Sequence, residues 1–203
     1  MATTIILVRH GQTEWNRVEH FRGRFNVPLN STGLKQADQV AKRISSQWKP
    51  TAVFTSPLIR AMQTAETIAR KCHLSALATD GLVDIDYGLW QGLTPEEART
   101  QWPELIANWF DHPRTVEIPG GESLLQVRDR AMSTLKQISW LHTDQEIVLV
   151  SHTVVNRLIL MGILGLGIDR FWHLRQEPCA MNIIEITGND FTLVSMNDTY
   201  HLL

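Results

Sequence analysis

Three short apolar runs, each followed by polar residues and then by a helical pattern, restrict the folds open to this chain most strongly. The runs are Ile5 to Val8, Ala52 to Thr55 and Ile147 to Val150, and they are rich in β-branched residues, as buried parallel strands are. Strands that alternate with helices in this way predict a mostly parallel sheet covered on both faces. We therefore expect an α/β fold, a three-layer αβα sandwich.

Further helices and a final pair of strands complete this alternation. Residues 30–44 have a helical pattern, and Thr94-Pro95-Glu96-Glu97 is typical of a capping box at a helix start. Two apolar stripes at helical spacing predict two more helices, one from Leu58, Met62, Ala65 and Ala69, the other from Leu124, Val127, Ala131, Leu135 and Ile138. Residues 182–187 and 191–195 predict two strands joined by a turn at Gly188-Asn189-Asp190.

Length and charge exclude several classes of protein. The 203 residues fit one compact domain, which we place at 1–203. A net charge of -2 leaves no wide basic surface for nucleic acid or for an anionic membrane. The longest apolar stretch, Leu158 to Ile168, is too short to span a bilayer, and the first residues lack the cationic start of a signal peptide. We expect a cytoplasmic protein in which Cys72 and Cys179 are reduced.

Polar residues with phosphate chemistry follow each of the three predicted strands. Arg9-His10-Gly11 follows the first, Ser56 to Arg60 the second and Ser151-His152-Thr153 the third. Ligands of such sheets bind beyond the carboxyl ends of the strands, so these segments should meet at one site. A histidine at one strand end is more often structural, but arginine forks beside a neutral imidazole suit attack on a bound phosphoryl group. We expect Arg9 to hold that group, His10 to attack it, and Gly11 to let the chain turn sharply beside the ligand.

Three motifs carry a resemblance to a known family. The stretches LVRHGQTEWN, TSPLIRAMQTAETIA and VSHTVVNR resemble those of the histidine phosphatase superfamily, which includes phosphoglycerate mutases and many small phosphatases, from about Ile5 to Ile186. The resemblance implies a phosphoglycerate mutase-like fold. We expect no cofactor and no metal, because two arginines and a second histidine supply the donors that phosphoryl transfer needs. The resemblance also implies that His10 is phosphorylated and that the phosphate pocket is completed by Arg9, Arg60 and His152. It further implies substrate contacts for Asn16, Arg22 and Gly23, and we also expect Gly11, Thr13 and Thr153 to contact the substrate.

The proton donor departs from the family pattern. Similar proteins of the family usually carry a glutamate shortly before an aromatic-glycine pair. In this chain the stretch LVDIDYGLWQG has Asp84 at that position. Aspartate is one methylene shorter, so either the loop approaches more closely or Asp86 takes the role. Thr153, in place of a common glycine, and Gln91, in place of a common glutamate, are further departures. Neither removes a group that the chemistry requires.

Three functions remain open, and a phosphatase acting on a small phosphorylated metabolite is favoured. Similar mutases carry basic residues at the positions of Ile85 and Asp86, where they would bind a second anionic group of the substrate. This chain has no basic residue at those two positions. Phosphoglycerate mutase activity is the alternative, and a catalytically silent phosphate sensor is the third. Specificity should come from the segment between Trp90 and Pro119, where the tryptophans either wall a pocket or, as we favour, pack the core. The sequence does not indicate an oligomeric state.

Overall fold

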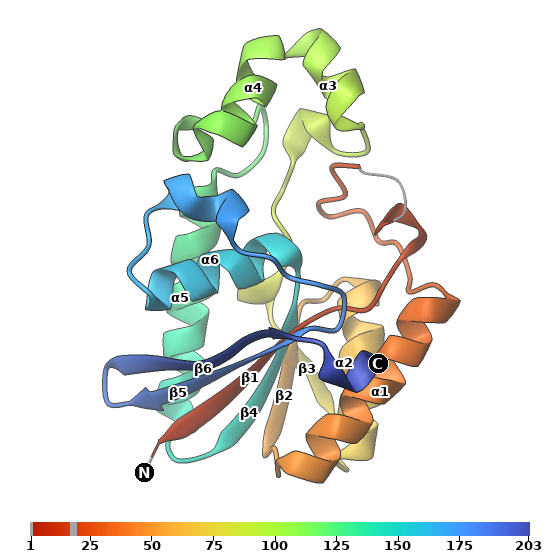
Figure 1. Ribbon diagram of the computed structural model, residues 1–203, viewed down its shortest axis with the longest axis vertical. Coiled ribbons are helices and arrows are strands. Elements are labelled where there is room, and N and C mark those ends of the chain that lie inside the picture. Colours follow the sequence, from red (N-terminus) through yellow and green to blue (C-terminus); the bar gives the residue numbers. More distant parts are fainter. Residues whose placement is uncertain (1, 17–19) are drawn as a thin grey trace.

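A six-stranded sheet lies at the centre of the protein (Figure 1), which the computed structural model describes over residues 2–16 and 20–203. The strand order is β3-β2-β4-β1-β5-β6. Its strands are β1 (Thr3–Arg9), β2 (Ala52–Thr55), β3 (Ala76–Ala78), β4 (Glu146–Ser151), β5 (Met181–Thr187) and β6 (Asp190–Asp198). Within the described residues β5 alone runs against the other strands, because it pairs antiparallel with both β1 and β6. The mostly parallel sheet is confirmed.

Helices cover both faces of this sheet, as the sequence predicts (Figure 1). They are α1 (Ser31–Gln47), α2 (Ile59–Lys71), α3 (Pro95–Gln101), α4 (Pro103–Asp111), α5 (Leu124–Leu141) and α6 (Thr153–Ile163). Alternate residues of β1 face opposite layers: Ile6 and Val8 pack with α1 and α2, whereas Ile5 and Leu7 pack with α5 and α6. Each such side chain is fully buried and contributes roughly 1.5–3 kcal/mol to folding.

The two helices predicted from apolar stripes differ in how well the predicted buried residues agree with the structure. All five residues of the second stripe are buried on α5. On α2, by contrast, the buried face is centred on Ala61, Ala65 and Ile68, and Met62 is only half-buried. Small alanines allow α2 to pack closely against its neighbours, so the sequence spacing alone did not fix which face turns inward. The edge strand β3 was not predicted.

The helix ends follow the local sequence closely. Thr94 forms the expected capping box with Glu97 at the start of α3, and Ser123 forms one with Gln126 at the start of α5. The helix α6 ends at Ile163, and Gly165 then adopts a φ of 65°, a left-handed conformation that glycine tolerates. None of the helices in the described residues is long and apolar enough to cross a membrane.

Residues 89–119, which we name the cap segment, lie above the sheet and contain α3 and α4 (Figure 1). The two ends of the segment meet, because the N–H of Leu89 donates a hydrogen bond of 2.9 Å to the carbonyl of Pro119. Trp90, Ile106 and Trp109 point inward and are essentially fully buried in the same core as α5 and α6. The cap segment is therefore packed onto the body of the protein by its own apolar side chains.

Candidate active site

The ends of β1 and β4 bring two histidines together. Arg9 is paired with Ser151 in the parallel register, and the next N–H, that of His10, donates to the Ser151 carbonyl at 2.9 Å. This register places His10 beside His152, with 5.1 Å between the centroids of their rings. Both imidazoles are buried, His152 completely. The expected convergence of the two strand ends is present in the structure.

His10 is held as a neutral imidazole with one free nitrogen. Its Nδ1 lies 2.7 Å from the carbonyl of Gly11. Because a carbonyl only accepts hydrogen bonds, Nδ1 carries the proton and the lone pair is on Nε2. Burial, followed by the positive charges of Arg60, Arg9 and Arg22, holds the pKa of His10 well below its usual value of 6.5. His10 lines an open cavity, and a neutral imidazole in that position is suited to nucleophilic attack on a ligand bound there.

Asp84 lies at the same site, and Asp86 does not. One oxygen of Asp84 accepts a 2.9 Å hydrogen bond from Arg60 Nη2 and lies 3.5 Å from Nδ1 of His152. The carboxyl group is nearly buried and lines the cavity. Asp86 instead accepts from the N–H of Gly88 at 2.9 Å, and its other oxygen pairs with Arg24 at 3.2 Å. The geometry therefore favours Asp84 over Asp86 as the carboxyl group available to a ligand.

Arg60 is fixed behind Asp84 by backbone carbonyls. Its Nη1 donates to the carbonyl of Phe25 and its Nη2 to that of Gly23, both at 2.8 Å. The side chain is completely buried, and its pKa is lowered first by that burial. Gly23, expected at the mouth of the pocket, is not among the residues that line it. Its positive φ of 48° instead turns its carbonyl toward Arg60.

Three guanidinium nitrogens at the site are buried without a hydrogen-bond partner in the described residues: Arg9 Nε, Arg22 Nη1 and Arg60 Nε. Arg9 is held in place by a 2.6 Å hydrogen bond from Nη1 to the carbonyl of Gln176. Burial lowers the pKa of Arg9 to about 9, so it remains cationic at neutral pH. Buried donors are costly when they are left unpaired. Unpaired cationic donors beside a neutral nucleophile indicate a site for an anion.

Of the glycine and threonine residues expected to contact the ligand, Thr153 lines the cavity, and Gly11 and Thr13 do not. A Cβ on Gly11 would lie 2.6 Å from the carbonyl oxygen of Gly33, so glycine is required there by the close approach of α1. Gly11 is not among the residues that line the cavity, and a turn beside the ligand stays a prediction. Thr13 is fully buried and bridges to Leu29, away from the cavity. Thr153 does line the cavity, whereas the side chain of Asn16 lies outside the described part of the chain.

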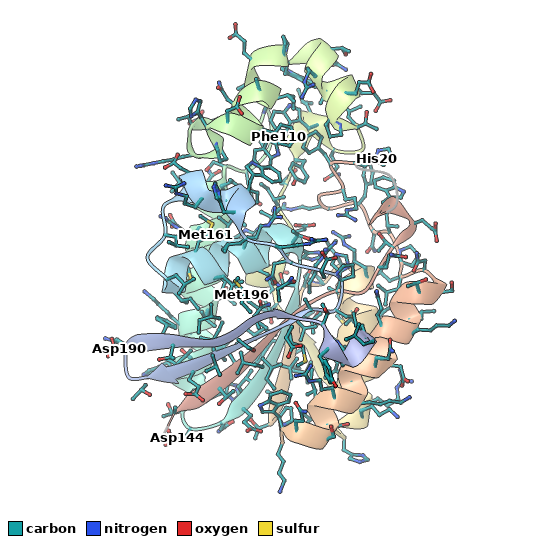
Figure 2. The ribbon with its side chains drawn as sticks, in the orientation of Figure 1. His20, Phe110, Asp144, Met161, Asp190 and Met196 are labelled. Carbon is teal, nitrogen blue, oxygen red and sulfur yellow. The ribbon has the colours of Figure 1, made fainter. Side chains whose placement is uncertain are left out.

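The cavity beside His10 has a volume of about 320 Å³. Its lining includes the polar residues Arg9, Arg22, Asp84 and Thr153. The lining also includes six aromatic residues, Phe21, Tyr87, Trp109, Phe110, Phe171 and Trp172. Figure 2 shows two residues that reach the cavity from different segments, Phe110 from α4 and His20 from the chain after β1. The volume suits a small metabolite.

Trp90, Trp102 and Trp109 of the cap segment were predicted either to pack the core or to wall a pocket. Trp90 is completely buried and does not line the cavity, and Trp102 packs against the same core while partly exposed. Trp109 does both, since it is buried in the core and one side of it faces the cavity. Core packing, the favoured interpretation, therefore holds for all three, and one of them is also a pocket wall.

The sequence did not point to three further charged residues that line the cavity: Arg157, Arg175 and Glu177. Arg157 is on α6, one helical turn after Thr153, so its spacing was the one available signal. Arg175 and Glu177 form an ion pair in the irregular segment before β5. No group of three or more histidine, cysteine, aspartate or glutamate side chains in the described residues is arranged to hold a metal ion.

Arg130 and Glu122 hold the Asp84 loop from behind. Arg130 on α5 donates to the carbonyls of Val83 at 2.7 Å and of Asp84 at 3.2 Å. The same guanidinium makes two 2.9 Å hydrogen bonds to the two carboxylate oxygens of Glu122. Glu122 in turn accepts from the N–H of Asp86 at 3.0 Å. One bidentate ion pair thus fixes the backbone on both sides of the residue that offers its carboxyl group to the cavity.

Comparison with known proteins decides the family. Residues 5–199 match the histidine phosphatase superfamily (branch 1). The chain belongs to this family. The match confirms the expected fold and the expected class of enzyme, a phosphoric monoester hydrolase.

Several relatives of this histidine phosphatase cover nearly all of its chain. Phosphoserine phosphatase 1 of Hydrogenobacter thermophilus is 33% identical over 98% of this chain and 93% of its own. The metal-independent phosphoserine phosphatase of Arabidopsis thaliana is 33% identical over 98% of this chain and 83% of its own. Phosphoglycerate mutase-like protein 4 of the same plant is 39% identical over 96% and 80%. The solved structure of Bacillus stearothermophilus YhfR superposes with a TM-score of 0.95 at 27% identity, covering 100% of both chains.

Proposed function

We propose that this histidine phosphatase hydrolyses small phosphomonoesters through a phosphohistidine intermediate on Nε2 of His10. The observation that carries the proposal is the neutral imidazole, with its free nitrogen, beside buried arginine donors that lack partners. Arg9 and Arg22 bind the phosphoryl oxygens, and Arg60 completes the positive field from behind Asp84. Thr153 and the first N–H groups of α6 add the positive end of a helix dipole at the same place.

Two displacements at phosphorus make up the cycle. In the first, Nε2 of His10 forms a bond to phosphorus while the bond to the ester oxygen breaks, and Asp84 gives its proton to the departing alkoxide. In the second, Asp84, now a carboxylate, takes a proton from water as the water oxygen bonds to phosphorus. The bond to Nε2 breaks, which releases inorganic phosphate and restores the neutral ring. The guanidinium groups supply the charge stabilisation that the transferring group needs.

In this proposal His152 contacts both reacting side chains, His10 and Asp84. Its ring lies against His10, and its Nδ1 faces Asp84. Nε2 of His152 lies 2.8 Å from the hydroxyl of Ser56, which also accepts from the N–H of Leu58. The hydroxyl has no other acceptor among the described residues, so we assign it as the donor to Nε2, which puts the ring proton on Nδ1, directed at Asp84. Burial and then the charge of Arg60 lower the pKa of His152 well below 6.5, so it stays neutral.

The mutase alternative has one observation against it and two in its favour. Ile85 is completely buried and Asp86 faces away from the cavity, so neither bears on a second anion of the substrate. The cavity does contain extra cations, Arg157 and Arg175, and a relative is named as mutase-like. With 3-phosphoglycerate and bisphosphoglycerate present, we expect release of inorganic phosphate to exceed formation of 2-phosphoglycerate. Rapid isomerisation without phosphate release would establish the mutase function instead.

A metal-free assay with nitrophenyl phosphate tests the proposal directly. The wild type should turn over the ester in the presence of EDTA and should accumulate an acid-labile, base-stable phosphoenzyme. His10→Ala should lose both turnover and labelling, whereas His112→Ala, an exposed histidine away from the cavity, should keep them. Absence of turnover by the wild type would favour the silent sensor. Activity lost to EDTA and restored by a divalent metal would contradict the mechanism.

A further inference from the structure

Arg157 is held rigidly in the wall of the cavity. Its Nε donates a 2.6 Å hydrogen bond to the carbonyl of Leu174. Its guanidinium carbon lies 5.1 Å from the ring centroid of Phe171 and 5.3 Å from that of Trp172, close enough for cation–π contacts. One hydrogen bond and two rings therefore fix the plane of the group. A fork fixed in this way loses little side-chain freedom when it binds a ligand.

The two terminal nitrogens of Arg157 are left for a ligand. Neither Nη1 nor Nη2 has a hydrogen bond or an ion pair with a described residue, and the side chain lines the cavity. Partial burial lowers the pKa of the Arg157 guanidinium below its ordinary value. Two parallel N–H donors at the end of a guanidinium match the two oxygens of a carboxylate.

The charges along the cavity indicate how many negative charges a substrate brings. Among the described residues, four guanidinium groups line it, those of Arg9, Arg22, Arg157 and Arg175. Arg175 is neutralised by its ion pair with Glu177. With Asp84 protonated, as the proposed first displacement requires, three cations remain in the lining, and they match a phosphate dianion together with one further monoanion. A substrate with two phosphate groups would bring more charge than the wall compensates.

We propose that Arg157 binds a carboxylate on the alcohol part of the substrate, so that the enzyme selects phosphorylated carboxylic acids of a few carbons. Arg157 lies about one helical turn after Thr153 on α6, and both side chains line the same cavity of about 320 Å³. We therefore expect a substrate of a few carbons to place its phosphate near Thr153 and its carboxylate at Arg157. This inference rests on the proposed phosphatase function and adds the class of leaving group to it.

Phosphoserine and phosphoethanolamine form a matched pair for the test, because they differ only by the carboxylate. We expect kcat/KM of the wild type to be roughly 10- to 100-fold higher for phosphoserine, the range of a charge-assisted bidentate contact. This ratio should fall to near one in Arg157→Met and to an intermediate value in Arg157→Lys, which keeps the charge but loses the fork. Arg170→Met, which removes an exposed arginine of the same region outside the cavity, should keep the wild-type ratio.

Each result decides for or against the inference. Equal turnover of the two esters by the wild type, or an unchanged ratio in Arg157→Met, would overturn it while nitrophenyl phosphate hydrolysis still supported the phosphatase function. If no phosphomonoester were hydrolysed at all, the proposed function and this inference would both be wrong. Circular dichroism melts check that the variants fold. If Arg157→Met does not fold, the ratios of the wild type and of Arg157→Lys decide the question.

Discussion

Replacing Arg130 by methionine should destabilise the protein strongly, although Arg130 does not touch the cavity. The change removes a bidentate ion pair with Glu122 and the hydrogen bonds to the Asp84 loop. Hydrogen bonds to charged groups contribute about 1.5–3 kcal/mol each, and breaking a buried pair costs about 3–5 kcal/mol. The two side chains are 21% and 19% exposed, so we discount this cost to about 3 kcal/mol. At this chain length the loss corresponds to a fall in Tm of roughly 6–12 °C.

Urea denaturation followed by circular dichroism measures this loss. Arg128→Met is on the same helix, and Arg128 pairs with exposed Asp129 alone among the residues that the structure describes, so this variant should change the free energy of unfolding by less than about 0.5 kcal/mol. A double-mutant cycle with Glu122→Gln should give a coupling energy of about 1–2 kcal/mol. Burial would raise the pKa of Glu122, but hydrogen bonds from Arg130 and from the backbone outweigh it and hold the pKa below 4.5. The coupling should therefore be present above pH 4.5 and disappear as the pH falls through the lowered pKa.

A loss below about 1 kcal/mol for Arg130→Met, or strict additivity of the two substitutions, would refute this reasoning. Either result would mean that the loop keeps its conformation without the ion pair.

Three further predictions concern the site itself. Asp84→Asn should slow enzyme phosphorylation by an alkyl phosphate about 10²–10⁴-fold and by nitrophenyl phosphate far less, measured as single-turnover bursts; equal losses would show that the carboxyl group only shapes the pocket. His10 stays neutral in the folded protein but protonates near pH 6.5 in the unfolded chain, so the free energy of unfolding should fall as the pH drops below 6.5. His10→Ala should make the dependence of this free energy on pH shallower, and equal slopes for the two proteins would contradict the lowered pKa. Gly11→Ala should cost about 1–3 kcal/mol in denaturant melts, because its Cβ would meet the Gly33 carbonyl, whereas Gly167→Ala, with only Asp169 at 3.7 Å, should cost little; the reverse order would refute the packing argument.

The strands could be predicted where the residues themselves prefer a buried strand. The runs that form β1, β2 and β4 are continuous and β-branched, so their type and their places along the chain followed from the sequence. β3 was missed because it has three residues, Ala76–Ala78, at the edge of the sheet, and alanine has little preference for strands. The helix α4 was missed as well. It begins at Pro103 directly after α3, and its inward face is set by packing of Trp109 against the core.

The site was predictable only as far as strand ends determine position. Arg9, His10 and His152 follow parallel neighbours, so topology alone brings them together. Arg157 is on a helix, and its spacing after Thr153 does not by itself distinguish an arginine that faces a cavity from one that faces water. The close contact of Gly11 with Gly33 could not be predicted for a similar reason, since Gly33 is on another element. Contacts between elements distant in sequence are properties of the packed chain.

The hydrogen bond between Leu89 and Pro119 makes the cap segment a unit that can be exchanged. Its ends are already joined, so segments of other lengths can start and finish at the same two points. Loop closure becomes only about 0.6 kcal/mol more costly for each doubling of length. A replacement must bring its own apolar residues to cover Phe21 and Phe171, but it leaves the histidines on the sheet undisturbed. An engineer could therefore change the breadth of accepted esters by grafting, while the bond-breaking groups keep their positions.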